Sequence, residues 1–331
     1  MTFSSCLPFF ETQSQKQMMS KIFLSIAVLF SLQACSESTR NGDGNSEDHT
    51  SPLSVSTINI ALKPNKNVQA QREDENTLGE ALSKRIGIPV KISTPTNKSI
   101  IEAGLANKTI DIGYVSSSDA ISFADNEVAD VLLAGLHSST NPAGKPYTGP
   151  YYYSVWLCLK ERPYQGISDL KGKPIAFSSR TSTSGYLIPC WDLMKKGLLP
   201  KGGSIEKFFG KGNVYYGSGY VSAVEQVLTG KAEAAAVSYY VFEKDKHLTV
   251  EQRSKLKVIQ RQGPVASHTF CIRKSLPSQD RQLIQDALLE IVEEEPQLSQ
   301  SLFGGTLVGV NSVEHLQAPR QAKSQVSTLK D

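Results

Sequence analysis

Strand-like and helix-like segments alternate along most of this chain, which predicts an α/β fold with doubly wound, mostly parallel sheets. The alternation begins near Thr57 and continues for more than 200 residues. A length of 331 residues suits two domains, each large enough to bury its own core. In such folds ligands bind at the carboxyl ends of the strands, so polar residues that follow predicted strands are the candidate site.

Short β-branched runs and amphipathic segments define the elements expected before residue 151. Gly87 closes the first helix, because glycine commonly ends helices. The segment 137–150 is rich in Ser, Asn, Pro and Gly and predicts a linker or surface loop. The expected strands are 58–62, 90–92, 110–115 and 131–134, and the expected helices are 73–85, 99–106 and 117–124.

The second half of the chain opens with an aromatic and aliphatic strand at 151–160. The strand at 256–260 and the strand at 268–272 are expected to return to the first domain, and the polar tail from Gln317 is expected to be loose. The other elements predicted here are strands at 175–177, 213–216 and 234–238, and helices near Thr183, at 221–229 and at 278–294.

The first 34 residues have the pattern of a secretory signal peptide. Lys21 precedes an apolar run, Ile22 to Leu32, which is too short to span a bilayer as a stable anchor. The following L-Q-A-C, which ends at Cys35, resembles a bacterial lipobox and implies cleavage before Cys35 and lipid attachment to its thiol. Met18 and Met19 are alternative translation starts, because a conventional signal begins only there.

Residues 35–54 are predicted to form a flexible tether. The stretch from Ser36 has almost no apolar side chains, so it cannot repay the entropy of ordering. A flexible chain of about 19 residues spans roughly 25 Å, enough to hold a domain just off a membrane. The expected location is therefore the periplasm or the cell surface, with a lipid anchor.

The charge balance limits the classes of partner. The net charge is +3 and no Lys and Arg stripe is present, which argues against nucleic-acid binding. Cys158, Cys190 and Cys271 lie among apolar residues without metal-ligand spacing, so core packing is favoured, although a disulfide between two of them stays open. We expect no metal, no cofactor and no catalytic residue.

The central stretch is Pro174 to Pro189, P-I-A-F-S-S-R-T-S-T-S-G-Y-L-I-P. A buried strand is followed by a hydroxyl-rich turn, and Ser182 is a natural N-cap for the next helix. This would leave the amides of Thr183, Ser184 and Gly185 unpaired at the positive end of a helix, where an oxyanion fits. An ordinary capped helix is the alternative. Pro189 is expected to kink the helix.

K-P-I-A-F followed by S-T-S-G-Y-L-I-P resembles the phosphonate-binding lipoproteins of ABC importers, a phosphate, phosphite and phosphonate solute-binding family. The resemblance covers roughly residues 56–295. It includes D-I-G-Y at Asp111–Tyr114, Y-Y-Y-S-V at Tyr151–Val155, I-S-D-L-K-G-K at Ile167–Lys173 and I-R-K at Ile272–Lys274. It implies a type II periplasmic-binding-protein fold whose first lobe is 55–149 with 258–331 and whose second lobe is 150–257, joined by a hinge.

The resemblance also implies a ligand cleft between the lobes. Tyr220 stands in the turn where these proteins commonly have a histidine, and His268 stands where they have an acid. Core packing is the alternative for Tyr220, a backbone-bonded strand histidine for His268, and a solvated loop charge for Arg180. The complete set of candidate ligand-binding residues is Ser182, Thr183, Ser184, Gly185, Tyr114, Ser116, Ser117, Tyr220, His268 and Arg180.

The predicted function is capture of a phosphorus oxyanion, namely phosphate, phosphite or a phosphonate, for an ABC permease and its ATPase, by a monomer. Because the acid is replaced by His268, an aminoalkylphosphonate is disfavoured. The alternatives are a binding protein for another small anion, a sensory partner of a receptor, and a hydrolase. A hydrolase would use a serine or cysteine with His137, His247, His268 or His315, but G-x-S-x-G and H-E-x-x-H are absent from the sequence.

Overall fold

The computed structural model describes residues 53–63, 68–95, 97–244 and 247–330. The predicted signal peptide, Cys35 and the tether up to residue 52 lie outside these residues. Within the described ranges, no helix has the length and apolar character needed to cross a membrane.

The first sheet is mixed, with strand order β13-β4-β12-β3-β1-β2. β1, β2 and β3 run parallel, and β12 pairs antiparallel with both β3 and β4. Helices cover both faces, since α1 and α9 share one hydrophobic cluster with the sheet and α2 and α3 share another. The strands are β1 (Ile58–Ala61), β2 (Val90–Ser93), β3 (Ile112–Val115), β4 (Ala129–Gly135), β12 (Thr269–Arg273) and β13 (Leu307–Gly309). The helices are α1 (Val68–Ile86), α2 (Lys98–Asn107), α3 (Ser117–Asp125), α9 (Ser278–Glu294) and α10 (Pro296–Phe303).

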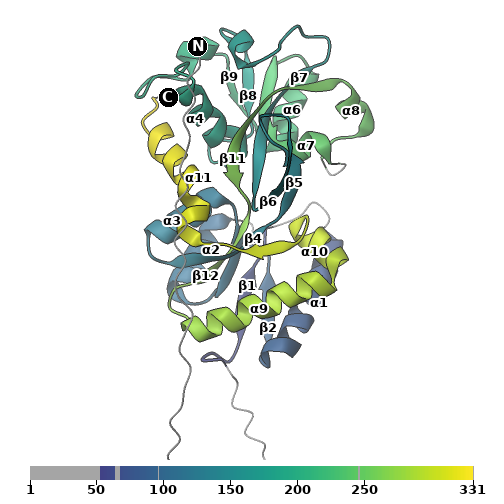
Figure 1. Ribbon diagram of the computed structural model, residues 1–331, viewed down its shortest axis with the longest axis vertical. Coiled ribbons are helices and arrows are strands. Elements are labelled where there is room, and N and C mark those ends of the chain that lie inside the picture. Colours follow the sequence, from purple (N-terminus) through teal and green to yellow (C-terminus); the bar gives the residue numbers. More distant parts are fainter. Residues whose placement is uncertain (1–52, 64–67, 96, 245–246, 331) are drawn as a thin grey trace, which may run out of the picture. The chain divides into compact units, whose positions relative to one another are not determined.

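The second sheet has the order β11-β7-β10-β8-β9, with β8, β9 and β10 parallel and β7 antiparallel to both β10 and β11. Its centre is fully buried around Trp156, Phe177 and Phe209. The α/β prediction is therefore confirmed in both sheets (Figure 1). The strands are β7 (Tyr151–Leu159), β8 (Ile175–Phe177), β9 (Val214–Tyr216), β10 (Ala234–Ser238) and β11 (Leu256–Ala266). The helices are a 3-10 turn (Ile167–Leu170), α4 (Ile188–Lys195), α5 (Glu206–Phe209), α6 (Tyr220–Leu228), α7 (Tyr239–Glu243) and α8 (Val250–Ser254).

The return of the chain to the first sheet comes later than expected. The strand at 256–260 was predicted to belong to the first lobe, but β11 pairs with β7 from Leu256 to Ala266 and belongs to the second sheet. The two connections between the sheets lie side by side, because the Ser267 amide donates to the Pro150 carbonyl at 3.1 Å. The expected boundary at residue 258 is therefore wrong, and the change of sheet occurs at Ser267.

The segment 137–150 is a β-hairpin and not a structureless loop. β5 (His137–Thr140) pairs with β6 (Pro146–Gly149) in a two-stranded sheet. Asn141 organises the turn, since its side-chain oxygen accepts from the amides of Ala143 and Lys145. The prediction failed because the turn residues dominated the local composition and masked the short β-prone runs on either side.

The C-terminal tail, predicted to be loose, is the helix α11 (Ser312–Val326). Asn311 caps it by accepting from the amides of Val313 and Glu314. Leu316 packs in the core of the first sheet, whereas Ala322 and Val326 pack in the core of the second. Figure 1 shows α11 passing from α3 towards α4, so this helix contacts both sheets.

The three cysteines in the described part of the chain are free and buried. This confirms core packing for Cys158, Cys190 and Cys271 and closes the disulfide alternative among them. Burial raises the pKa of each thiol, for Cys271 to about 12, so these thiols stay protonated.

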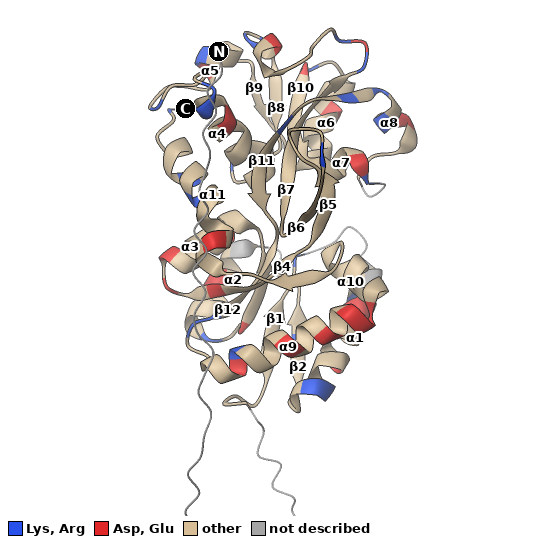
Figure 2. Ribbon diagram, viewed as in Figure 1, with Lys and Arg blue, Asp and Glu red and all other residues tan. Residues whose placement is uncertain are grey.

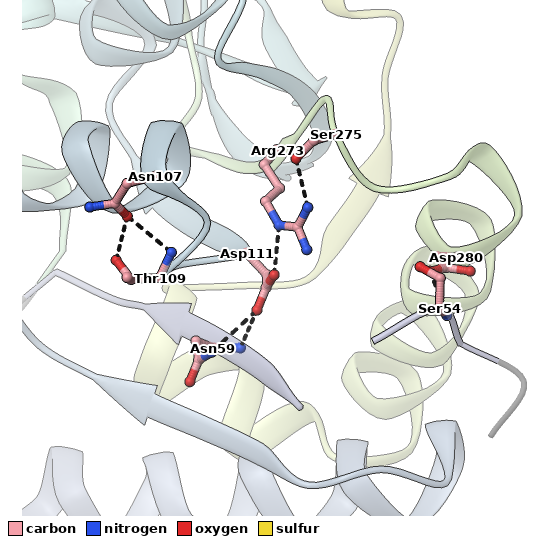
Figure 3. Close-up of polar contacts among 8 residues, drawn as sticks. All are labelled: Ser54, Asn59, Asn107, Thr109, Asp111, Arg273, Ser275 and Asp280. Atoms are coloured by element: carbon pink, nitrogen blue, oxygen red, sulfur yellow. Dashed lines mark hydrogen bonds and ion pairs between the residues drawn. The ribbon is translucent and has the colours of Figure 1, made fainter. Parts of the chain in front are cut away.

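A buried ion pair closes one edge of the first sheet (Figure 3). Arg273 Nε lies 2.7 Å from Asp111 Oδ1, and both side chains are less than a tenth exposed. The second carboxylate oxygen accepts from the Asn59 amide at 2.7 Å, and the guanidinium donates to Ser275 at 2.6 Å. The charges of this pair are therefore hydrogen-bonded on both sides, and they join β1, β3 and β12.

Candidate functional site

The candidate residues gather where the carboxyl ends of parallel strands lie. Tyr114 ends β3, and Ser116 and Ser117 follow it; His268 precedes the antiparallel β12 and so lies at the same edge of the first sheet. In the second sheet the S-T-S-G turn follows β8 and Tyr220 follows β9. A hydrogen bond from Ser118 Oγ to the Thr181 carbonyl at 3.4 Å brings the two groups together. We call these the facing edges of the two sheets.

The S-T-S-G turn begins with one wide helical turn. Ser182 is the N-cap, and its hydroxyl accepts from the Gly185 amide at 2.9 Å. The Leu187 amide then donates to the Ser182 carbonyl, five residues back, which defines a π-turn over Thr183–Leu187. Pro189 has no amide hydrogen to donate to the Gly185 carbonyl. This carbonyl instead accepts from the backbone amide of Ser178 at 3.1 Å. The π-turn thus accommodates Pro189 in the first turn of α4, where a kink was expected.

The turn keeps fewer free amides than the sequence suggests. The Gly185 amide is used by the cap, so the expectation of three unpaired amides is wrong for this one. In the described chain, the amides of Thr183 and Ser184 have no internal acceptor, because they open the helix. The Thr183 hydroxyl is buried and also has no partner there. Two amides and one hydroxyl therefore remain to bind an acceptor.

Gly185 has a packing role that the sequence does not reveal. A Cβ at this position would lie 2.3 Å from Ser178 Oγ and 2.8 Å from Ser182 Oγ. The Ser178 hydroxyl is itself held by the Ala236 carbonyl at 2.8 Å. Only a glycine leaves room for the turn to fold against β8.

Ser184 lies at the centre of a cluster of four hydroxyl groups. Its Oγ is 2.8 Å from the Tyr220 hydroxyl and accepts from Tyr152 at 3.5 Å, while Tyr240 donates to Tyr220 at 3.4 Å. Four hydroxyls supply four hydrogens, but only three contacts join them. One hydrogen, on Ser184 or on Tyr220, is therefore left for another acceptor. Tyr220 belongs to this polar cluster rather than to plain core.

The first-sheet serines differ from each other. Ser116 Oγ donates to Asp119 at 2.6 Å and lies 3.0 Å from Ser118 Oγ, so it is engaged within the start of α3. The Ser117 hydroxyl is fully buried, and no described residue bonds to it. Ser117 thus has a binding capacity that Ser116 lacks.

Tyr114 is mainly a core residue. Its ring packs against Phe270 and Phe303, and its hydroxyl donates to the Phe303 carbonyl at 3.4 Å. Burial raises its pKa. The ring centroid lies 5.9 Å from that of His268, so Tyr114 supports the facing edge from behind.

His268 pairs with a lysine that sequence patterns did not single out. Lys63 follows β1, and its Nζ lies 3.0 Å from His268 Nε2. Burial lowers the pKa of His268 well below its usual value, and the positive charge of Lys63 lowers it further. The imidazole is therefore neutral near pH 7, and it contacts the side chain of Lys63.

Arg180 lies over an aromatic ring. Its guanidinium carbon is 4.2 Å from the centroid of Tyr216, a cation–π contact. Arg180 is exposed in the loop after β8, which fits the alternative of a solvated loop charge. Whether Arg180 also reaches a ligand stays a prediction.

Three aromatic residues at the facing edges were missed. His137 Nδ1 lies 3.0 Å from the Tyr239 hydroxyl, and its ring centroid is 4.9 Å from that of Tyr152. Burial, followed by the charge of Lys244, lowers the pKa of His137 to about 4. Tyr152 and Tyr240 complete the hydroxyl cluster around Ser184. Tyr152 lies in the Y-Y-Y-S-V motif, which was the available signal; the segment of His137 was assigned to a loop.

Hydrogen-bonding capacity, and not the size of surface hollows, identifies this site. Hollows of about 530 and 200 Å³ are lined by α1 with β2 and by β4 with α9, away from the facing edges. Over the described residues, no group of three or more His, Cys, Asp or Glu could hold a metal ion. The arrangement offers hydrogen-bond donors, which can bind an anion without catalysing a reaction of it.

Residues 60–314 match a family model described as ABC transporter, phosphonate, periplasmic substrate-binding protein. This match covers more than three quarters of the chain.

Solved structures with low sequence identity share the fold. PhnD1 from Prochlorococcus marinus, in complex with methylphosphonate, is 16% identical with a TM-score of 0.63, over 82% of this chain and 99% of that chain. A binding protein component of an ABC phosphonate transporter from Pseudomonas aeruginosa is 17% identical with a TM-score of 0.62, over 82% and 87%. A Xanthomonas citri protein bound to ATP is 16% identical with a TM-score of 0.62, over 82% and 100%. These similarities confirm the predicted periplasmic-binding-protein fold.

Proposed function

Since the chain belongs to the family of phosphonate ABC transporter periplasmic substrate-binding proteins, we propose that it captures a phosphorus oxyanion between its facing edges. The family is an extracytoplasmic component of a transporter and not an enzyme, so the hydrolase alternative is discarded. Its partners are a small-molecule ligand and an ABC permease with its ATPase. We propose phosphate, phosphite or a phosphonate as the ligand.

The observation that carries this proposal is the set of donors at the facing edges that have no partner among the described residues. They are the amides of Thr183 and Ser184, the buried hydroxyls of Thr183 and Ser117, and the spare hydrogen shared by Ser184 and Tyr220. A tetrahedral oxyanion presents mainly acceptors, which match such donors. Three or four charged hydrogen bonds at ~1.5–3 kcal/mol each approach the ~8 kcal/mol of a micromolar site, before the costs of closure.

The surroundings of His268 support the exclusion of an aminoalkyl group. His268 stands where the sequence resemblance expects an acid, and Lys63 lies beside it. A ligand ammonium at this position would meet a lysine charge instead of a carboxylate. Hinge closure about the connections at Pro150 and Ser267 is the capture mechanism we propose.

We also propose that the protein is a lipid-anchored monomer, attached through Cys35. The support is the L-Q-A-C sequence that follows the apolar run. Labelled fatty acid should be incorporated into the protein in cells, and Cys35→Ala should abolish the label and release the protein into the soluble fraction. Persistence of the label in Cys35→Ala would overturn the anchor.

A thermal-shift series tests the proposed ligand class. Purified protein is screened with phosphate, phosphite, methylphosphonate and sulfate, and at least one phosphorus oxyanion should raise the melting temperature. Ser184→Ala should diminish that rise, because it removes the centre of the hydroxyl cluster. Ser254→Ala, on the exposed surface of α8, is the matched control. A rise with sulfate alone, or with no oxyanion, would overturn the proposal.

A further inference from the structure

We propose that the site binds a phosphorus oxyanion only when the three oxygens that face its donors carry no hydrogen, so that a protonated ligand gives up its proton to the solvent on binding. This inference rests on the proposed function and defines the ionisation state of its ligand. The bound form of a phosphonate is then the dianion.

The groups without an internal partner at the facing edges are donors. The amides of Thr183 and Ser184 can only donate. The hydroxyls of Thr183 and Ser117 are buried and have no partner among the described residues. A buried hydrogen that lacks an acceptor is costly. The bound group must therefore offer an acceptor to each of these four hydrogens.

A hydrogen on one of the ligand oxygens would upset this match. A deprotonated phosphonate presents three oxygens that only accept, whereas a protonated one has an O–H that must itself donate. An amide cannot accept that hydrogen, and a hydroxyl can accept it only by giving its own hydrogen to another acceptor. The protonated form therefore loses a charged hydrogen bond and meets a second donor, which should weaken its binding about a hundredfold.

The hydroxyl cluster around Ser184 does not ionise to create an acceptor. Burial raises the pKa of Tyr152 and of Tyr240 well above the usual value of a phenol, so both keep their hydrogens. Tyr152 donates to Ser184 and Tyr240 donates to Tyr220. The hydrogen that remains on Ser184 or Tyr220 is a further donor towards the ligand.

The histidines and cations of the facing edges do not take up the ligand proton. The pKa of His137 is lowered to about 4 and that of His268 well below its usual value, in both cases mainly by burial, so neither holds a proton near pH 7. The nearby cations are Lys63, Lys244 and Arg180, and an ammonium or guanidinium group donates but does not accept.

Asp119 is the rival acceptor for the ligand proton. It lies in the first turn of α3, and its carboxylate accepts from the Ser116 hydroxyl at 2.6 Å, at the start of its own helix. If this carboxylate also faced the ligand, a protonated oxyanion would bind without releasing its proton. The number of protons released on binding therefore distinguishes the two arrangements.

Calorimetry in buffers with different heats of ionisation measures this number, with methylphosphonate as the probe. At a pH one unit below the second pKa of the free ligand, which phosphorus NMR gives, about 0.8 of a proton should be released per ligand bound. The apparent affinity should rise roughly tenfold from one pH unit below that pKa to one unit above it. Binding without proton release, or an affinity that does not change with pH, would overturn the inference and leave the proposed function standing.

Three variants identify the source of the proton. Asp119→Asn removes the rival acceptor, and His247→Gln removes a titratable ring that packs on Tyr240 with centroids 5.5 Å apart. Both variants should release as many protons as the unaltered protein, as should the control Asp286→Asn on the exposed side of α9. Release that disappears in Asp119→Asn or His247→Gln would assign the proton to that side chain and overturn the inference. Failure of methylphosphonate, phosphite and phosphate to bind at any pH would overturn the proposed function as well.

Discussion

The two ends of the first sheet carry polar side chains in opposite states. At one end Asp111 and Arg273 form a buried ion pair whose remaining hydrogen-bonding groups reach Asn59 and Ser275 (Figure 3). At the facing edge Ser117 is equally buried, yet its hydroxyl has no partner among the described residues, and the same holds for Thr183 across from it. The saturated network stabilises the fold, whereas the unsaturated groups are available to a ligand.

The charged side chains on the surface are distributed without a concentration of one sign. Figure 2 shows Lys, Arg, Asp and Glu interspersed over outer helices such as α1, α8 and α9 instead of gathered in a stripe of one sign. The ion pairs on those helices are exposed or half-exposed, as for Lys255 with Glu251. Such pairs contribute little to stability. An anion site on this protein is therefore local, as the net charge of +3 predicts.

The largest effect is expected at the saturated end. Arg273→Met removes one partner and leaves the Asp111 carboxylate buried and uncompensated, which should lower the free energy of unfolding by about 3–5 kcal/mol. Urea denaturation measures this. Arg281→Met, which breaks a half-exposed pair with Asp130, is the control and should cost less than about 1 kcal/mol. Equal costs for the two variants would remove the distinction between the ends of the sheet.

The second effect is on binding and should hardly touch stability. Thr183→Val keeps the shape of the side chain and removes a buried hydroxyl that has no internal partner in the described structure. Affinity for the oxyanion should fall by ~1.5–3 kcal/mol, since one charged hydrogen bond is lost. Calorimetry measures the affinity, and urea denaturation measures the stability. A large loss of stability with unchanged affinity would place Thr183 with the structural residues instead.

A third prediction concerns the glycine of the turn. Gly185→Ala places a Cβ against Ser178, so the free energy of unfolding should fall by about 1–3 kcal/mol through overpacking. Ligand affinity should fall as well, because the turn must shift. Gly166→Ala, where an added Cβ meets nothing within 4 Å, is the control. A stable, fully binding Gly185→Ala would show that the turn tolerates a side chain.

The smallest effect is expected in the pH dependence. It comes from buried histidines such as His137 and His315 and not from the Asp111 network, which contains no histidine. The folded-state pKa of His137 is about 4, below the ~6.5 of an unfolded histidine. The unfolded chain therefore binds more protons between these values, and stability is full above pH 6.5 and falls towards pH 4. His137→Gln should reduce the change in melting temperature over this interval, and the buried His315 should retain its own contribution. An unchanged slope would contradict the assignment.

The elements with a strong local pattern could be predicted from the sequence. The helix at 278–294 and the strand at 234–238 have the predicted bounds, because amphipathic period and buried alanine and valine runs are local signals. β11 could not be assigned to the correct sheet, since its assignment depends on pairing with the distant β7. The β5–β6 hairpin is local, but its turn residues masked the short β-prone runs on either side. α11 was missed because its few apolar contacts are divided between two cores.

The site shows the same limit. Ser182 as a cap and the turn after β8 follow from local chemistry. The tyrosine hydroxyls clustered around Ser184 come from β7, α6 and α7, so only folding brings them together. The motifs D-I-G-Y and I-R-K illustrate the converse. Asp111 and Arg273 pair with each other away from the site, so the charged residues of these motifs form a structural network.

Helix α11 has a mechanical consequence for hinge closure. Leu316 is embedded in one hydrophobic cluster and Val326 in the other, and the helix between these two residues forms a rod of about 15 Å. A rod fixed at both ends limits how far two bodies can separate, so opening must bend the rod or withdraw one end. Pro319 lies between the attachments and removes one backbone hydrogen bond there. We therefore expect Pro319, which lies outside the proposed binding site, to influence the amplitude of opening.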